Sequence, residues 1–232
     1  MIKYNKEKEE VLYMNTIHIF CFMGKVNAGK SMYVKRILSD SKFANRFNLS
    51  SLVTGTTRKQ RESEKDGDEY YFFTEEKYKT ILDEELVESR SYYTLTDGVV
   101  YYFTKIEYLK TEKNILCITT PYQYETYKHW CEKENIKTPG KYKLHLIYID
   151  TDIKIRIDRA LSEIQTEEEI CEFARKILRD KNEFDDVSKR IPELIDPMLS
   201  NNVCFIFNNS EEYNNIKDNL HKIKSFIERS LK

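Results

Sequence analysis

The stretch that decides the fold is IHIFCFMGKVNAGKSMYVKRILS, residues 17–39. Its first part, residues 17–23, is a short run of β-branched and aromatic side chains, as expected of a buried strand. Gly24 and Gly29 follow, five residues apart in a chain that has only six glycines. Residues 31–39 then carry apolar side chains at helical spacing. The stretch therefore predicts a strand, a glycine loop and a helix in succession.

The loop between strand and helix carries the pattern G-x-x-x-x-G-K-[ST] in full. Glycine lets backbone amides approach an anion closely, and the N-terminus of the next helix adds a favourable dipole, so such a loop cradles phosphate. Lys30 would neutralise the β- and γ-phosphates of ATP, and the Ser31 hydroxyl would be a ligand of Mg²⁺. A plain glycine turn with a charged cap is the alternative. The residues expected to hold ATP are Gly24, Lys25, Val26, Asn27, Ala28, Gly29, Lys30 and Ser31.

The rest of the chain alternates short apolar runs with helical patterns. Buried strands are expected to begin near residues 17, 115, 144 and 203, and this alternation implies an α/β fold with a parallel sheet covered on both faces. Residues 50–105 interrupt the alternation with runs typical of antiparallel strands, starting with one strand over residues 50–56. This segment is interpreted as an inserted subdomain.

Composition limits the class of protein further. The chain has 232 residues, with 38 basic and 39 acidic side chains, so there is no overall attraction to nucleic acid or to an acidic membrane. The five cysteines are scattered without a C-x-x-C pair, which favours reduced core thiols in a cytoplasmic protein. Residues 1–16 are charged, lack a signal-peptide core and are expected to be an N-terminal extension.

The segment after the glycine loop resembles the nucleotide-binding region of guanylate kinases. Together with the loop, five short motifs occur in the family's order over residues 17–105. The four beyond the loop are TGTTR with Arg61 (T-T-R-x-x-R), DGDEYYF at 66–72 (D-G-x-D-Y-x-F), LVE at 86–88 (F-[IL]-E) and YYFT at 101–104 (Y-Y-G-[ST]).

The resemblance implies a P-loop NTPase three-layer sandwich with a parallel sheet, an inserted nucleoside monophosphate (NMP)-binding subdomain and a helical lid. The core would comprise residues 17–49 and 106–232, with the lid at about 152–180 and the NMP-binding subdomain at 50–105. The implied activity is transfer of the ATP γ-phosphate to GMP or dGMP with Mg²⁺. The expected partners are these nucleotides, with neither nucleic acid nor membrane, in a monomer or homodimer.

The same resemblance assigns a grip on the acceptor's phosphate. Arg58 and Arg61 would bind it through the fork of donors that a guanidinium offers. Tyr70 and Tyr102 would add hydroxyl hydrogen bonds to it. The alternatives are a solvated loop for the two arginines and ordinary strand aromatics for the two tyrosines.

A second group would read the acceptor's base. By resemblance, Glu88 would accept hydrogen bonds from guanine N1 and N2, and Thr54 and Thr104 would contact the base near O6. A carboxylate rejects the N1 acceptor of adenine, because its lone pairs are left unpaired. The alternative for Glu88 is a surface carboxylate.

The resemblance also implies cationic groups for the transition state, in which positive charge on the moving phosphoryl group matters most. Lys30, Arg58, Arg159 and Arg175 are the candidates. Surface ion pairs with neighbouring acids are the alternative for Arg175. Asn208 would lie near the adenine of ATP.

Three departures from the family pattern leave alternatives open. Phe103 stands where the family has glycine, and the interval between Glu88 and Tyr102 is longer than the family usually shows. Cys117 and Thr119 replace both aspartates of the I-L-D-x-D element. An acceptor with another base, or a partner-binding domain without catalysis, are therefore the competing hypotheses.

Overall fold

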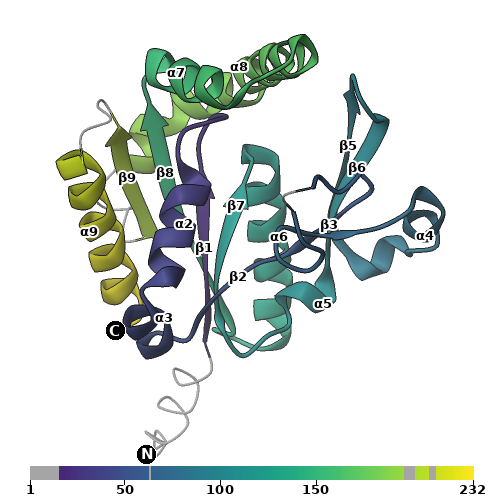
Figure 1. The fold of residues 1–232 in the computed structure, drawn as a ribbon. Helices are drawn as coiled ribbons and strands as arrows, with labels where there is room; N and C mark the ends of the chain where they lie inside the picture. The colour runs from purple at the N-terminus through teal and green to yellow at the C-terminus, as the bar shows by residue number, and fades with distance from the viewer. Residues whose placement is uncertain (1–15, 63, 196–201, 209–212) are drawn as a thin grey trace, which may run out of the picture.

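The structure is a computed structural model that describes residues 16–62, 64–195, 202–208 and 213–232. Within these ranges the chain forms a five-stranded and a four-stranded sheet, with helices packed around them (Figure 1). The extension expected over residues 1–16 falls almost wholly outside the described residues. None of the described helices is long and apolar enough to cross a membrane.

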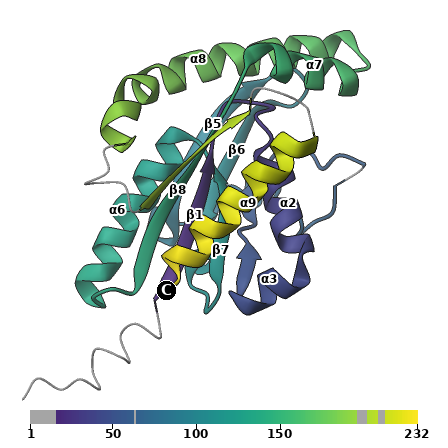
Figure 2. The ribbon, with the colours of Figure 1, turned by 90° about the vertical axis from the view of Figure 1, so that its left-hand side faces the viewer.

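The larger sheet is parallel throughout, in the order β2-β7-β1-β8-β9. Its strands are β1 (Ile17–Met23), β2 (Leu49–Ser51), β7 (Asn114–Thr119), β8 (Tyr142–Thr151) and β9 (Val203–Asn208). One face is covered by α2 (Lys30–Ser39), α3 (Ser41–Arg46) and α9 (Tyr213–Ser230), and the other by α6 (Pro121–Lys137) (Figure 2). The predicted α/β fold is confirmed.

Strand β1 is apolar throughout because its alternate side chains enter two different cores. Phe20 and Phe22 pack with residues of α2 and α9, whereas Ile19 and Cys21 pack with residues of α6. All four side chains are fully buried. The strand that leads into the glycine loop is therefore anchored from both faces.

The smaller sheet has the order β4-β3-β6-β5. Its strands are β3 (Thr54–Thr56), β4 (Tyr70–Phe72), β5 (Leu86–Thr94) and β6 (Gly98–Lys105), with α4 (Glu75–Lys79), the 3₁₀ turn η1 (Asp83–Glu85) and α5 (Ile106–Leu109) beside it. The single strand expected over residues 50–56 is wrong. Its first half is β2, which pairs with β7 in the parallel sheet, and its second half is β3, which pairs with β4 and β6.

Two helices lie across the carboxyl edge of the parallel sheet (Figure 1): α7 (Ile153–Glu163) and α8 (Glu167–Ile195). Helix α8 begins at a capping box, in which the Thr166 hydroxyl accepts from the Glu169 N–H and the Glu169 carboxylate accepts from the Thr166 N–H. It runs to residue 195, beyond the lid expected at about residues 152–180. The edge that α7 and α8 cover is where open α/β sheets bind ligands.

Candidate active site at the glycine loop

The glycine loop follows β1 as predicted, and both of its outer glycines are required by geometry. A Cβ on Gly24 would lie 2.4 Å from the carbonyl oxygen of Ile149, so a side chain has no room there. Gly29 precedes α2 with φ 95°, in the left-handed region that favours glycine. A Cβ on Gly29 would also approach Arg159 Nη1 to 3.3 Å.

Lys30 folds back over the loop. Its ammonium donates to the carbonyl oxygens of Gly24 at 2.7 Å and Lys25 at 2.8 Å. Burial lowers the pKa of Lys30 to about 8; the Asp180 carboxylate opposes this shift, and Arg179 and Arg156 add to it. A cationic environment of this kind is suited to a polyanion.

Two arginines of α7 hold the carbonyl side of the loop. Arg156 Nη1 donates to Val26 O at 3.4 Å, and Arg159 Nη1 donates to Asn27 O at 3.0 Å. The predicted transition-state residue Arg159 therefore lies against the loop itself. Its catalytic role stays a prediction.

Asp180 is a residue of this site that the sequence analysis missed. Its carboxylate accepts a hydrogen bond from the Val26 N–H of the loop and pairs with Arg179 Nη2 at 2.6 Å. Asp180 is 1 % exposed. The carboxylate therefore contacts a loop amide that is predicted to bind a phosphate of ATP. Only the packing of α8 brings this residue to the loop, so its sequence position carries no signal.

Asn208, at the end of β9, ties the loop to two helices. Its Nδ2 donates to Ala28 O at 3.3 Å, and its Oδ1 accepts from the Tyr33 hydroxyl and from Asn219 Nδ2, both at 2.8 Å. The side chain is buried. These contacts support the loop, and a contact with the adenine of ATP stays a prediction.

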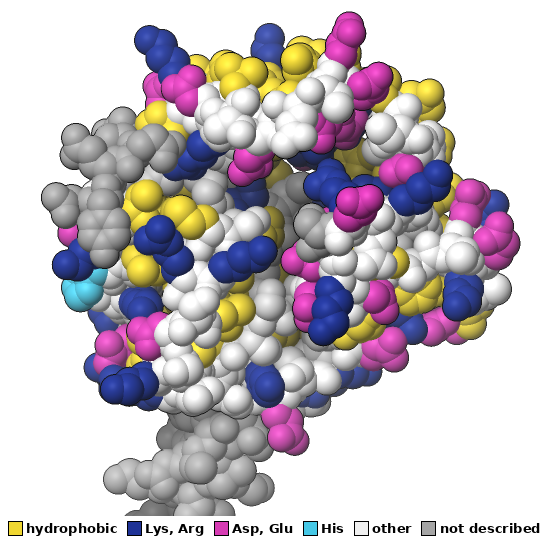
Figure 3. Space-filling model, in the orientation of Figure 1, with side chains coloured by type: hydrophobic (Ala, Val, Ile, Leu, Met, Phe, Trp, Pro, Cys, Tyr) yellow, Lys and Arg dark blue, Asp and Glu magenta, His cyan; other side chains and the backbone are white. Residues whose placement is uncertain are grey.

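A cavity of about 1220 Å³ opens between the loop, the smaller sheet and α8. Figure 3 shows the hollow beneath α7 and α8, with Lys and Arg side chains at its rim. The predicted site residues that line it are Gly24, Val26, Asn27, Lys30, Ser31, Thr54, Arg58, Arg61, Tyr70, Tyr102 and Arg175. Those outside its wall are Lys25, Ala28, Gly29, Glu88, Thr104, Arg159 and Asn208.

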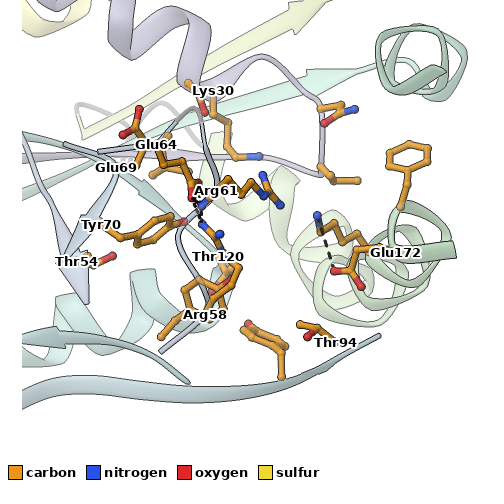
Figure 4. Close-up of a pocket in the computed structure, with 18 of the residues that line it drawn as sticks. Lys30, Thr54, Arg58, Arg61, Glu64, Glu69, Tyr70, Thr94, Thr120 and Glu172 are labelled. Carbon is orange, nitrogen blue, oxygen red and sulfur yellow. Dashed lines mark hydrogen bonds and ion pairs between the residues drawn. The ribbon is translucent and has the colours of Figure 1, made fainter. Parts of the chain in front are cut away.

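Arg58 and Arg61 share this cavity with Lys30, and Figure 4 shows Arg61 extending into the space between Arg58 and Lys30. Arg58 Nη2 donates to both carboxylate oxygens of Glu64, at 2.7 and 2.9 Å, and the Arg58 guanidinium lies 5.6 Å from the centre of the Tyr70 ring. Burial opposes the charged form of Arg58, but Glu64 and Tyr102 together outweigh it and the pKa of Arg58 rises. Glu64 thus orients the arginine that is predicted to bind phosphate.

Tyr70 and Tyr102 pack edge to face, with ring centres 5.6 Å apart. Burial raises the pKa of Tyr70, and the neighbouring Tyr102 raises it further. The hydroxyl of Tyr70 therefore stays protonated at neutral pH and is available as a donor. Both tyrosines belong to the cavity wall beside Arg58.

Glu88 lies behind the cavity wall, and its side chain is 0 % exposed. Its Oε1 accepts from Thr104 Oγ1 at 2.7 Å and from Gln123 Nε2 at 3.2 Å. Its Oε2 accepts from Arg90 Nε at 2.9 Å. Arg90 and Gln123 line the cavity, so they separate the Glu88 carboxylate from it. Neither was identified from the sequence, although Arg90 has the period-two spacing that puts it on the face of β5 that carries Glu88.

Phe103 does not enter the cavity. It is fully buried and packs with Phe73 and Tyr78 on the other face of the smaller sheet. A Cβ on Gly55 would lie 2.3 Å from the Phe103 ring, so Gly55 makes the room that this side chain occupies. Phe103, which departs from the family's glycine, therefore lies outside the cavity wall.

The long β5–β6 hairpin closes one side of the cavity. Tyr92 and Thr94 line it, and the Tyr92 hydroxyl donates to Glu183 Oε1 on α8 at 3.4 Å. The Arg179 guanidinium lies 5.5 Å from the centre of the Tyr92 ring. The additional residues of the hairpin thus join the smaller sheet to α8.

Cys117 and Thr119 face the cavity from the end of β7. Cys117 Sγ lies 3.5 Å from Cys21 Sγ, and both thiols are free. The Thr119 hydroxyl is buried and has no hydrogen-bond partner among the described residues. Neutral side chains therefore occupy the two positions where the family carries aspartate.

Arg175 lines the cavity from α8 and pairs with Glu172 at 2.7 and 2.8 Å. The Glu172 carboxylate raises the pKa of Arg175. This is the ion pair that the sequence analysis kept as an alternative to a catalytic role. The same guanidinium still faces the cavity, so the pair orients it toward that space.

Comparisons with known proteins agree with this architecture. Residues 16–107 match the family model described as guanylate kinase. The guanylate kinase of Prochlorococcus marinus (strain MIT 9312) is 32% identical over 72 residues, and this alignment spans 31% of the chain and about a third, 36%, of that protein. A crystal structure of guanylate kinase from Anaplasma phagocytophilum shares the fold with a TM-score of 0.53 at 14% identity, over 94% of this chain and 87% of that chain. The chain is therefore similar to guanylate kinases in sequence over residues 16–107, and it shares their fold over most of its length.

Proposed function

We propose that this protein is an ATP-dependent NMP kinase whose acceptor is GMP or dGMP. The observation that carries the proposal is the single cavity that Lys30 and Ser31 of the glycine loop share with Arg58 and Arg61. A phosphate loop alone names no acceptor. The two guanidinium groups in the same cavity supply a second anion site, and phosphoryl transfer between two nucleotides needs two such sites in one cavity.

In this proposal the loop amides and Lys30 bind the ATP phosphates, and Arg58 and Arg61 bind the phosphate of the acceptor. An oxygen of the acceptor phosphate attacks the γ-phosphorus in line, the bond from that phosphorus to the β–γ bridging oxygen breaks, and ADP leaves. No side chain acts as a nucleophile. Arg175 and the lid helices bring positive charge and exclude water.

Mg²⁺ is expected with the ATP. Ser31 lines the cavity and is exposed, so its hydroxyl oxygen is available as a ligand beside phosphate and water oxygens, which suits a hard cation. The neutral Cys117 and Thr119 supply no carboxylate here. Mg²⁺ would neutralise part of the charge on the phosphates.

A coupled assay of ADP formation with a panel of nucleoside monophosphates tests the proposal. GMP or dGMP should be the best acceptor, and Arg61→Ala should raise the KM for the acceptor while leaving the KM for ATP nearly unchanged. Arg46→Ala, at an exposed position of α3 that does not line the cavity, is the matched control. ATP binding without turnover of any monophosphate would instead support a binding domain, which the missing aspartates at 117 and 119 favour.

A further inference from the structure

Arg90 occupies the wall of the cavity at the point where the base is predicted to bind. It follows Glu88 by two residues on β5, lines the cavity and is 13% exposed in its side chain. It is anchored on Glu88 and on Thr120, whose hydroxyl lies 3.3 Å from Arg90 Nη1. Neither anchor belongs to the loop that carries Arg58 and Arg61.

The Glu88 carboxylate has little acceptor capacity left for hydrogen bonds from a base. Thr104, Gln123 and Arg90 already donate three hydrogen bonds to it, and its side chain is 0% exposed. An ionised carboxylate has about four acceptor positions. A base in the cavity therefore meets the guanidinium of Arg90 before it meets Glu88.

Two polar groups at this point of the wall, one on Arg90 and one on Thr119, have no partner among the described residues. Arg90 Nε is bound to Glu88, and Nη1 lies 3.3–3.4 Å from Thr120 Oγ1 and the Tyr92 hydroxyl. No described residue accepts from Arg90 Nη2. The buried hydroxyl of Thr119, next to Thr120, also has no partner among the described residues. Arg90 lines the cavity, so a ligand in it, or water, can accept from Nη2.

We propose that Arg90 reads the acceptor's base through O6 and N7 of a 6-oxopurine. This inference rests on the proposed function and names the substrate class of that site. Arg90 Nη2, together with Nη1 once it gives up its long contacts to Thr120 and Tyr92, matches the adjacent O6 and N7 acceptors, whereas adenine presents an amino group at the same edge. The 2-amino group of guanine lies on the far side of the ring from O6 and N7, where Arg90 makes no contact, so hypoxanthine is accepted as well as guanine. The substrates are then GMP, IMP and their deoxy forms.

Equilibrium binding measured by calorimetry tests this assignment without requiring turnover. GMP and IMP should bind within about threefold of each other, and AMP should bind about 10- to 100-fold more weakly, which is the discrimination of one bidentate pair. 7-Deaza-GMP, which lacks the N7 acceptor, should bind about tenfold more weakly than GMP. Arg90→Met should remove most of the preference for GMP over AMP, and Arg46→Met on the surface of α3 is the matched control.

Two results would overturn the assignment. The first is that IMP binds about 30-fold or more weakly than GMP. The second is that Arg90→Met weakens the binding of GMP, IMP and AMP equally, as the loss of a phosphate contact would do. If Arg90→Met does not fold because Glu88 loses its partner, the double variant Glu88→Gln/Arg90→Met removes both charges. Selective binding without phosphoryl transfer would end the proposed kinase function and keep the assignment. Absence of binding by any purine monophosphate would end the assignment itself.

Discussion

Replacing Lys30 by methionine separates the contribution of this side chain to ATP binding from its effect on the free energy of unfolding. Its ammonium is held inside the loop with the pKa lowered from 10.5 to about 8 by burial. The difference corresponds to about 3 kcal/mol against the charged form in the folded state, at about 1.4 kcal/mol per pH unit. The hydrogen bonds to Gly24 O and Lys25 O return about 1 kcal/mol each. At pH 7 the free energy of unfolding of the Lys30→Met variant should therefore be about 1 kcal/mol higher than that of the parent. The variant should at the same time no longer bind ATP.

The pH dependence has a definite sign. Below pH 8 the lysine is charged in both the folded and the unfolded chain, so the full cost of burying the charge is present. Between about pH 8 and 10.5 the folded chain loses this proton while the unfolded chain keeps it, so the stability of the parent rises with pH relative to the variant. The difference in the free energy of unfolding between Lys30→Met and the parent should fall by about 1.4 kcal/mol per pH unit in this window.

Urea unfolding of both proteins at pH 7, 8, 9 and 10 measures this difference, in which the other titrating groups cancel. Lys35→Met, whose parent side chain is 76% exposed, serves as the control and should show a difference that is flat with pH. A difference between Lys30→Met and the parent that is also flat would refute the reasoning. It would mean that water reaches Lys30 and that the loop does not shield its charge.

Three further outcomes are expected. The Asp180→Asn variant keeps an acceptor for the Val26 N–H but removes the negative charge beside the loop. Calorimetry should therefore show that ATP binds about tenfold more tightly. Equal or weaker binding would contradict a competition between Asp180 and phosphate for the loop. The Arg58→Lys variant keeps a positive charge opposite Glu64 but loses the guanidinium group. Steady-state kinetics should show that the KM for the acceptor rises about tenfold and that the KM for ATP stays nearly unchanged. An equal rise in the two KM values would argue for a structural role of Arg58. The Gly24→Ala variant places a Cβ 2.4 Å from the carbonyl oxygen of Ile149. Urea unfolding should show that the free energy of unfolding falls by about 2 kcal/mol or more. An unchanged free energy of unfolding would contradict the tight fit of β1 against β8.

The sequence by itself determined the strand, the glycine loop and the helix over residues 17–39. These depend on local chemistry: a continuous apolar run for a strand buried on both faces, glycines where the backbone turns, and a polar start to the helix. The alternation of strand and helix patterns predicted the α/β fold, and the resemblance predicted that Arg58 and Arg61 would share a cavity with Lys30. Only the roles assigned to these side chains await the assays.

Only the tertiary structure decided what surrounds these residues. Asp180 contacts Val26 across 154 positions of sequence, because α8 packs over the loop. Residues 50–56 divide between two sheets, because Leu49–Ser51 finds its partner in β7 and Thr54–Thr56 finds its partners in β4 and β6. Arg90 covers Glu88 because their side chains share one face of β5 and the carboxylate needs a partner when it is buried. Such contacts depend on how distant elements pack, which no local pattern encodes.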